Sequence, residues 1–335
     1  ARSNGSCETY QMMKVSVIVP VYKVEPFIGR CMRSLMEQTL QDVEFIVVDD
    51  CSPDNSISIA KQVAGDYPDR LVTFIVHEVN KGLPAARNTG LAMAKGKYVF
   101  HCDSDDFVEA DMLEGLYEKA ESESADIVWC DWFLSFERNE RYMKQPYYDS
   151  AMNALKGMLS GVMKYNVWNK LVRRELYTTN AISFPAGYGM GEDMTMIKLF
   201  ACAETVAYLP KAFYHYVKLN ALAFSNTYSD KHLVELRHNI EDTLFFLEDR
   251  FGEKLKLEME FFKLDVKYPF LISDDSRRHE LWKSWYPEAN VYISRNKNVS
   301  VRRRILQQLA ANGQYWLISF YYKFVHKFIY GLIFR

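Results

Sequence analysis

The chain has 335 residues, of which 49% are hydrophobic and 15% aromatic, and its net charge is -2. This length and composition provide a sizeable core and indicate two domains, or one domain with a large appendage. The near balance of acidic and basic residues argues against nucleic acid as a partner, because no basic field spans the chain. The composition is also that of a globular protein and not of a disordered one.

Six cysteines are scattered along the sequence, and none forms the Cys-x-x-Cys pair of a structural zinc site. We therefore expect free thiols in a reducing, cytoplasmic setting. Residues 1–13 are mostly polar and lack the apolar core of a signal peptide. We expect them to form an N-terminal extension outside the fold, disordered or left over from cloning.

From Lys14 onward, apolar runs that suit strands alternate with segments whose apolar residues have helical spacing. The expected strands are residues 14–20, 43–50, 71–78 and 97–103, and the helices between them are 26–40, 52–67 and 82–96. Strands that are apolar throughout and alternate with helices predict a mostly parallel, Rossmann-like α/β sheet with helices on both faces.

The pattern changes near Asn220. Two further strands are expected before it, at 125–136 and 205–217, whereas only helices follow it, at about 229–250, 253–272 and 301–311. We therefore predict an α/β domain over residues 14–219 and a helical C-terminal region over residues 220–335.

The last segment, 314–335, is predicted to be an amphipathic helix. Its large apolar residues fall on one face, namely Trp316, Leu317, Phe320, Phe324, Phe328 and Leu332. Two lysines and a histidine interrupt a run that is barely long enough to span a membrane. The helix either lies at a membrane interface or packs on the chain's own core. Arg302, Arg303 and Arg304 just upstream either meet anionic lipid headgroups or form a solvated face.

Polar residues gather at the ends of the expected strands. Asp50 follows the second strand, Asn80 and Gly82 the third, and Asp103 and Asp105 the fourth. The carboxyl ends of parallel strands share one edge of a sheet, where open α/β folds bind their ligands. Asp-x-Asp at that edge suits Mg²⁺ or Mn²⁺, which prefer oxygen ligands and are often completed by substrate phosphates. Acidic loops are common, however, so this tripeptide alone is a weak signal.

Two common nucleotide-binding motifs are absent from the sequence. There is no Gly-x-Gly-x-x-Gly after the first strand and no Gly-x-x-x-x-Gly-Lys-Ser/Thr in the chain. These absences argue against a dinucleotide dehydrogenase and against a P-loop NTPase. Side chains and a metal ion must therefore hold the phosphates of any nucleotide that binds.

Four separated motifs together resemble the family 2 glycosyltransferases. They are VSVIVPVYKVEPFIGRCMRSLMEQTLQDVEFIVVDDCSPDNS, NKGLPAARNTGLAMAKGKYVFHCDSDD, WNKLVRRELY and GEDMTMIKLF, in the family's order and spacing, between about Lys14 and Val217. The resemblance implies a GT-A fold and an inverting enzyme that uses a nucleotide-sugar donor. The helical region after residue 220 carries no motif that can be transferred.

The resemblance also implies a donor site at the edge of the sheet. Asp50 matches a carboxylate that accepts a hydrogen bond from a pyrimidine ring, and Lys23 stands where the family usually has Asn. Lys218 stands where many relatives have Arg, a residue that meets phosphate. The full set of donor-binding residues implied is Pro20, Tyr22, Glu25, Asp50, Asn80, Gly82, Arg87, Asp103 and Lys218.

The remaining matches concern the metal, the base and the acceptor. Asp105 matches the direct ligand of a divalent cation, Mn²⁺ or Mg²⁺, with Asp103 beside it toward the donor. Asp193 matches the catalytic base. The segment near the acceptor is matched by Trp168, Asn169, Lys170 and Glu192. His215 is a weaker match to a further metal or phosphate ligand of some relatives.

Each of these residues alone also has a structural alternative. Tyr22 would be an ordinary aromatic residue at a strand end, and Arg87 a residue on the surface of a helix. Asp50 and Ser52 would cap the helix after the second strand, because Asp and Ser are preferred there. Glu192 and Asp193 would only begin a helix, and Asp106 would cap one that starts near Val108.

The reaction implied is a single displacement in which an acceptor hydroxyl attacks the anomeric carbon of a UDP-hexose or UDP-N-acetylhexosamine. We expect transfer of one sugar to a glycan or lipid-linked acceptor in surface polysaccharide biosynthesis. The sequence lacks the Gln-x-x-Arg-Trp motif and the transmembrane helices of processive relatives. We also expect a cytoplasmic protein, peripheral on the inner face of the membrane. The alternative is an inactive nucleotide-sugar-binding or scaffold protein of the same fold.

Overall fold

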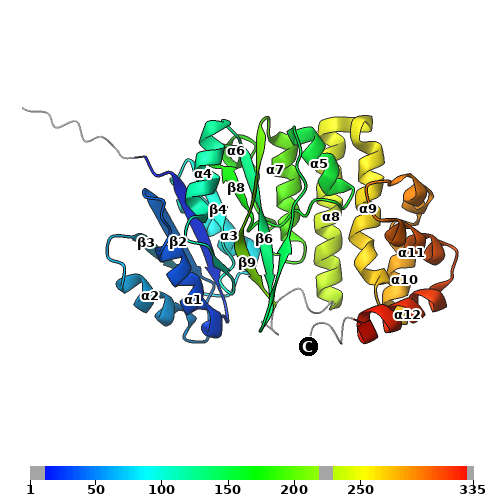
Figure 1. Ribbon diagram of the computed structural model, residues 1–335, viewed down its shortest axis with the longest axis horizontal. Coiled ribbons are helices and arrows are strands. Elements are labelled where there is room, and N and C mark those ends of the chain that lie inside the picture. Colours follow the sequence, from blue (N-terminus) through cyan, green and yellow to red (C-terminus); the bar gives the residue numbers. More distant parts are fainter. Residues whose placement is uncertain (1–11, 219–228, 330–335) are drawn as a thin grey trace, which may run out of the picture. The chain divides into compact units, whose positions relative to one another are not determined.

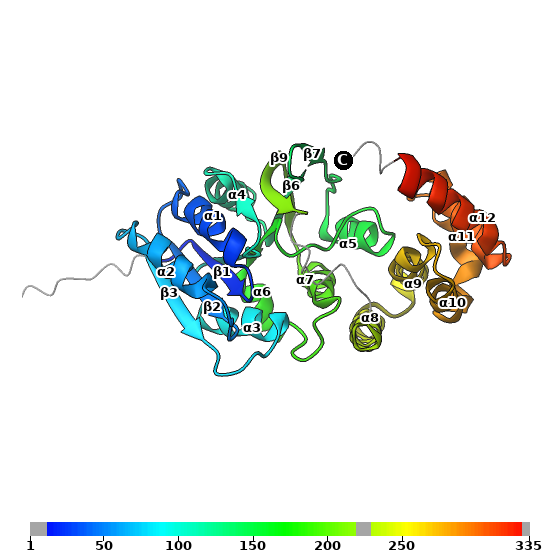
Figure 2. The ribbon, with the colours of Figure 1, turned by 90° about the horizontal axis from the view of Figure 1, so that it is seen from below.

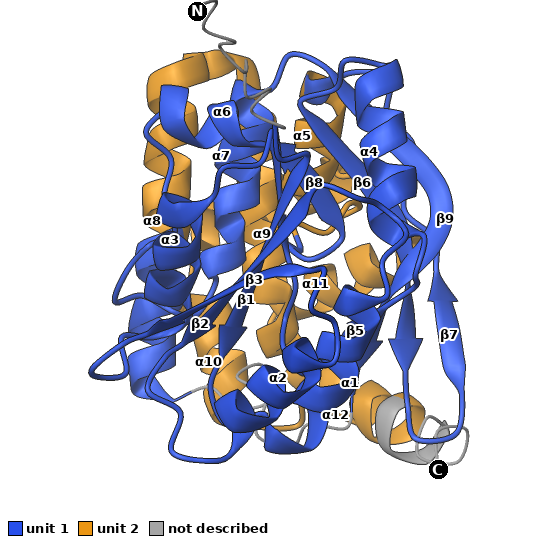
Figure 3. Cartoon of the chain, turned by 90° about the vertical axis from the view of Figure 1, so that its left-hand side faces the viewer, with its two compact units in different colours: residues 1–151, 166–239 blue, residues 152–165, 240–335 orange. Residues whose placement is uncertain are grey.

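The computed structural model describes residues 12–218 and 229–329. The predicted domain boundary at residues 219 and 220 lies outside this range. The chain divides into two compact units (Figure 3), of which unit 1 comprises Ala1–Ala151 and Asn166–Asn239 and unit 2 comprises Met152–Tyr165 and Ile240–Arg335. A short piece of the predicted α/β domain, residues 152–165, therefore belongs to unit 2.

Unit 1 is built on a nine-stranded sheet within the described residues (Figure 1), in the order β3-β2-β1-β4-β8-β6-β9-β5 with β7 beside β6. The strands are β1 (Val15–Val21), β2 (Val43–Asp49), β3 (Leu71–Val76), β4 (Tyr98–His101), β5 (Phe107–Val108), β6 (Ile127–Ser135), β7 (Glu140–Met143), β8 (Lys170–Arg173) and β9 (Val206–Val217). All six strands expected from the sequence are present.

The sheet has a parallel half and a mixed half. β1 pairs in parallel with β2 and β4, and β2 pairs in parallel with β3. β8 runs antiparallel to both of its neighbours, β4 and β6, while β6 and β9 are parallel. The sequence did not predict β8, because its four residues are too few for a periodic signal.

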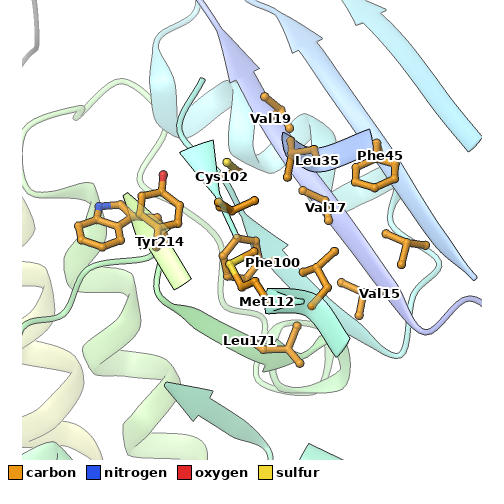
Figure 4. Packing of buried hydrophobic residues seen from close by; sticks show 14 of the residues in the cluster. Val15, Val17, Val19, Leu35, Phe45, Phe100, Cys102, Met112, Leu171 and Tyr214 are labelled. Carbon is orange, nitrogen blue, oxygen red and sulfur yellow. The ribbon is translucent and has the colours of Figure 1, made fainter. Parts of the chain in front are cut away.

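Helices cover both faces of the parallel half, as predicted. The helices of unit 1 are α1 (Glu25–Met36), α2 (Ser56–Gly65), α3 (Leu83–Met93), α4 (Met112–Ser122), α6 (Arg174–Thr179), α7 (Thr195–Cys202) and the start of α8 (Asp230–Phe251). Val17 of β1 lies in one buried cluster with Leu35 of α1 and Met112 of α4 (Figure 4). Ile18 faces the other way, where any side chain at Gly90 of α3 would collide with it.

All regular secondary structure in the described residues of unit 2 is helical. Besides the rest of α8 this unit contains α5 (Ala151–Leu159), α9 (Lys256–Leu271), α10 (Ser276–Ser284), α11 (Val301–Ala311) and α12 (Tyr315–Tyr321), with α10 to α12 together in Figure 2. The helices predicted at about 229–250, 253–272 and 301–311 are confirmed, whereas α10 was not predicted. The helix predicted over 314–335 is α-helical at Tyr315–Tyr321 and π-helical at Tyr322–Ile329, and its last residues, 330–335, lie outside the described range. Arg303 ties α11 to α9 through a 2.7 Å ion pair with Asp265. Among the helices of residues 12–218 and 229–329, none is long and apolar enough to cross a membrane.

Candidate active site

Asp50 organises the loop that follows β3. Its buried carboxylate accepts hydrogen bonds from the backbone N–H groups of Lys81 and Gly82, each at 2.8 Å, and lies 2.7 Å from Nδ1 of His77. Gly82 has a φ of 86°, a conformation that favours glycine. The structure therefore assigns this carboxylate to the 80–82 loop and not to a cap on α2, which begins at Ser56.

Arg87 of α3 is the central cation of the candidate site. Its side chain is only 2% exposed, so the alternative of a surface helix residue is wrong. Nη2 lies 2.9 Å from Oδ1 of Asp103 and 3.3 Å from Oε1 of Glu192. Burial opposes the charge, but attraction to the two carboxylates outweighs it and raises the pKa of Arg87. One guanidinium thus joins the Asp-x-Asp segment after β4 to the Glu-Asp pair before α7.

Part of this network lacks hydrogen-bond partners. Within the described residues, Nε and Nη1 of Arg87 and Oε2 of Glu192 are buried and make no hydrogen bond. Each unsatisfied buried polar group typically costs about 1–3 kcal/mol. Polar atoms that a fold leaves in this state are suited to a polar ligand or ordered water.

The three carboxylates after β4 have different surroundings. Asp103 and Asp105 are partly exposed, whereas Asp106 is buried and accepts hydrogen bonds from Tyr214 Oη at 2.7 Å and from the backbone N–H of Val217 at 2.8 Å. Burial, reinforced by the charges of the other two, raises the pKa of Asp106 well above its ordinary value. The prediction that Asp106 caps a helix near Val108 is wrong, because Val108 lies in β5 and the next helix begins at Met112.

The donor set around these carboxylates suits a divalent cation that also binds the substrate. No group of three or more His, Cys, Asp or Glu side chains is placed to hold a metal ion within residues 12–218 and 229–329. Mg²⁺ is often bound by one or two carboxylates, with substrate phosphates and water as the other ligands. Asp103 and Asp105, two residues apart after β4, could supply the one or two carboxylates of such a site, with the other ligands coming from the substrate and water.

Glu192 and Asp193 begin a short 3-10 turn, Glu192–Met194, that leads into α7. The structural alternative, that this pair begins a helix, is therefore correct for the backbone. Burial is the main reason that the pKa of Glu192 is raised to about 8 and that of Asp193 to about 6. A carboxylate with a pKa near 6 is still ionised at neutral pH and is a better proton acceptor than an ordinary aspartate.

The loop before this turn is held by α8. The side-chain amide of Asn239 donates to the carbonyls of Tyr188 and Met190, both at 2.9 Å, and Glu235 accepts from the N–H of Met190 at 3.1 Å. Asn239 is 3% exposed. These contacts fix the backbone two residues before Glu192, although no motif in the sequence marked α8 as part of the site.

Comparisons with known proteins identify the family. The family model for glycosyl transferase family 2 matches residues 16–189, which is more than half of the chain. The chain belongs to glycosyl transferase family 2. The membership predicted from the four motifs is thereby confirmed.

Curated relatives support the same assignment. The chain is 36% identical over 212 residues to the uncharacterized glycosyltransferase EpsJ of Bacillus subtilis, a match that spans 60% of each chain. It is 31% identical over 265 residues to the cholesterol galactosyltransferase of Borreliella burgdorferi, over 74% of this chain and 72% of that one. The chain therefore spans less than two thirds of the length of EpsJ, and more than two thirds of the length of the cholesterol galactosyltransferase.

A solved structure confirms the predicted fold class. The crystal structure of S. aureus TarS 1-349 in complex with UDP-GlcNAc superimposes with a TM-score of 0.68, over 93% of this chain and 92% of that chain. The identity is 21%, so the likeness is one of fold. The helical C-terminal part falls within the coverage, in agreement with a GT-A domain that has a helical extension.

The segment expected near the acceptor is buried in this family 2 glycosyltransferase. Trp168 stacks on Tyr214 with ring centroids 4.5 Å apart. The Asn169 side chain donates to the carbonyl of Cys130 at 2.9 Å and accepts from Lys170 Nζ at 2.8 Å. Burial lowers the pKa of Lys170 to about 7. Acceptor contact by these residues stays a prediction, since their observed partners belong to the chain itself.

The remaining predicted donor residues lie around the same edge of the sheet. Tyr22 is 42% exposed just after β1, and Pro20 is buried within that strand. The carboxylate of Glu25 accepts hydrogen bonds from the backbone and side chain of Asn55. The Asn80 side chain donates to the carbonyl of Asp50 at 3.1 Å. Their contacts with a donor stay predictions.

The two candidates near the end of β9 differ, since His215 lies within the strand and Lys218 directly follows it. His215 is buried between Phe107 and Phe133, and its ring nitrogens lie 2.7 Å from Glu109 and 2.6 Å from Glu140. Tyr214 beside it points instead toward Asp106, so adjacent β9 residues face opposite ways. Lys218 is exposed, which leaves its side chain accessible for the predicted phosphate contact.

Proposed function

We propose that the chain is an inverting, non-processive glycosyltransferase that transfers one sugar from a UDP-hexose or UDP-N-acetylhexosamine to a hydroxyl of a glycan or lipid-linked acceptor. The observation that carries the proposal is the pair of contacts that buried Arg87 makes with Asp103 and Glu192, which joins the Asp-x-Asp segment to the Asp193 turn. TarS is described with UDP-GlcNAc, which supports a UDP-linked donor. A poly(ribitol-phosphate) beta-glucosyltransferase among the relatives supports a role in surface polysaccharide synthesis.

Asp193 is the proposed general base. An acceptor hydroxyl is a weak nucleophile, and a positioned base that takes its proton during attack accelerates the reaction by ~10²–10⁴-fold. The pKa of Asp193, raised to about 6 mainly by burial, keeps the carboxylate ionised at neutral pH and increases its basicity. Attack on the face opposite to the departing diphosphate inverts the anomeric configuration.

The donor side of the site is proposed to comprise Asp103, Asp105 and Arg87. Asp105 and Asp103 would hold Mn²⁺ or Mg²⁺, which as a Lewis acid stabilises the negative charge of a leaving diphosphate when it is bound. Arg87 holds Asp103 in place through the 2.9 Å ion pair. Its buried position also fixes the distance between that carboxylate and Glu192, which precedes the base.

We further propose that the enzyme works in the cytoplasm, at the inner face of the membrane. The five cysteines of the described range are free, including Cys31 and Cys102, whose sulfur atoms lie 3.9 Å apart. Free neighbouring thiols are typical of a reducing compartment. A scaffold protein of the same fold is the competing function, and it would require neither the raised pKa of Asp193 nor the joined carboxylates.

The test is release of UDP from a panel of UDP-sugars, with Mn²⁺, with Mg²⁺ and with a chelator. We expect release from at least one UDP-sugar, faster with the cation. Asp105→Ala should abolish the effect of the cation, whereas Asp111→Ala, a matched carboxylate loss on the exposed surface, should retain it. Turnover of the wild type that is equally fast in chelator would refute the proposed metal site. Binding of UDP-sugars without any turnover would favour the scaffold function.

A further inference from the structure

We infer that the face formed by α11, α12 and the π-helical turn Tyr322–Ile329 docks on an anionic lipid surface. The first observation is the distribution of charge. No Asp or Glu occurs after Glu288, whereas eight basic residues do, namely Arg295, Lys297, Arg302, Arg303, Arg304, Lys323, Lys327 and Arg335. A chain whose net charge is -2 therefore has a strongly basic end in unit 2.

The second observation is which face of α12 is covered. Ile318 is fully buried, and Tyr315 stacks on His279 of α10 with ring centroids 5.2 Å apart. These two residues anchor the helix to the core of unit 2. The sequence left open whether this segment lies at a membrane interface or packs on the chain's own core, and α12 packs on the chain through the face that carries Ile318 and Tyr315.

Within the described residues, three aromatic side chains of the predicted apolar stripe are exposed. Trp316, Phe320 and Phe324 are 71%, 67% and 54% exposed, at a spacing of four residues along the helix. On the neighbouring α11, Val301 and Ile305 are 61% and 53% exposed, also four residues apart. Single exposed apolar residues are common on protein surfaces, whereas a group of five large ones on two adjacent helices is typical of an interaction site.

The charges beside this face identify the occupant. Arg302 and Lys323 are exposed next to the apolar residues, while Arg303 is engaged by Asp265. An apolar helix face with aromatic residues and basic flanks is typical of helices that lie in the headgroup region of a membrane. Anionic headgroups meet the basic residues, and the acyl boundary accepts the aromatic rings. A protein partner for this face would need acidic and apolar groups together, and no feature of residues 12–218 and 229–329 points to such a partner.

The experiment is flotation of the full chain with vesicles, without donor or acceptor, so that its outcome is independent of the proposed reaction. We expect binding to vesicles that contain phosphatidylglycerol, and much weaker binding to vesicles of phosphatidylcholine alone. The triple variant W316S/F320S/F324S should bind at least about tenfold more weakly, because moving even one large apolar side chain out of water strengthens binding by about that factor. The variants Arg302→Gln and Lys323→Gln should each lose about fivefold, and the loss should shrink at high salt.

Two matched controls lie on other helices of unit 2. Phe245→Ser removes a 71% exposed phenylalanine from α8, and Lys283→Gln removes an exposed lysine from α10. Both should bind vesicles like the wild type, and thermal unfolding should show that all variants are folded. Equal flotation of the triple variant and the wild type would overturn the inference. So would self-association of the wild type that the triple variant abolishes while vesicle binding is absent, because a second copy would then cover the face.

Discussion

Arg87 and Lys267 are both buried cationic side chains, one in each unit, but their partners differ. Lys267 has no exposed surface, and its ammonium group donates to the carbonyls of Trp285 and Tyr286 and to the side chain of Asn290, at 2.7 to 3.1 Å. These are three acceptors for three donors. Arg87 meets two carboxylates through one nitrogen, whereas its Nε and Nη1 lack partners in the described residues.

The difference distinguishes a structural cation from one in a site. The lysine closes the turn at Tyr286, which has a positive φ of 48°, and its bonds are complete without a ligand. The arginine instead keeps two ionisable carboxylates in place and leaves polar atoms unsatisfied at the edge of the sheet. A buried charge that its own fold does not satisfy is a stronger indication of function than burial itself.

The largest effect should come from the base beside the Arg87 network. Asp193→Asn keeps the size of the side chain but removes the proton acceptor, so kcat for sugar transfer should fall ~10²–10⁴-fold. UDP binding should stay within a few-fold of the wild type, because the base faces the acceptor in the proposed mechanism. Calorimetric titration with UDP measures the second quantity. Loss of UDP binding together with activity would contradict the assignment of the base.

Arg87→Lys tests whether the shape of the cation is needed. A lysine retains the charge but lacks the planar guanidinium whose Nη2 contacts both Asp103 and Glu192, so the two carboxylates should shift relative to each other. A misplacement of about 1 Å near a reacting centre can lower the rate ~10²-fold, and we expect a loss of kcat/KM of that order. Steady-state kinetics give this number. Wild-type kinetics in the lysine variant would make Arg87 equivalent to Lys267, a satisfied structural charge.

The sequence predicted the parallel half of the sheet and the polar segments that follow its strands. Apolar strand runs, helical spacing between them and carboxylates at strand ends are all local signals. It could not predict that Arg87 pairs with Glu192, or that Asn239 holds the loop before Asp193. Those partners are brought together by chain folding over long separations, and no residue pattern encodes them. His77 was missed for the same reason, since its bond to Asp50 depends on how β2 and β3 pair.

The pH dependence should follow the carboxylate of Asp193. Its pKa is raised to about 6, and the ionised form is the active one, so kcat should be level near neutrality and fall tenfold per pH unit below about 6. A rate profile for UDP release between mild acid and neutral pH shows this limb. Glu192→Gln removes the neighbouring titrating group and should leave the limb in place. If kcat of that variant no longer fell at acidic pH, the group whose ionisation controls the rate would be Glu192 and not Asp193.

The smallest effect on catalysis should come from Lys267→Met. Methionine keeps an apolar stem against Trp282, whose ring lies 4.3 Å from the ammonium group in the wild type. The carbonyls of Trp285 and Tyr286 would each lose a donor, which should lower the free energy of unfolding by about 1–3 kcal/mol. Because Lys267 and its partners belong to unit 2 and the Arg87 network belongs to unit 1, kcat and KM per folded molecule should not change. Thermal unfolding and kinetics on one preparation measure both quantities. A loss of activity without a loss of stability would contradict this comparison. A buried cation with all its donors satisfied would then be functional, and unsatisfied donors would not distinguish Arg87 from Lys267.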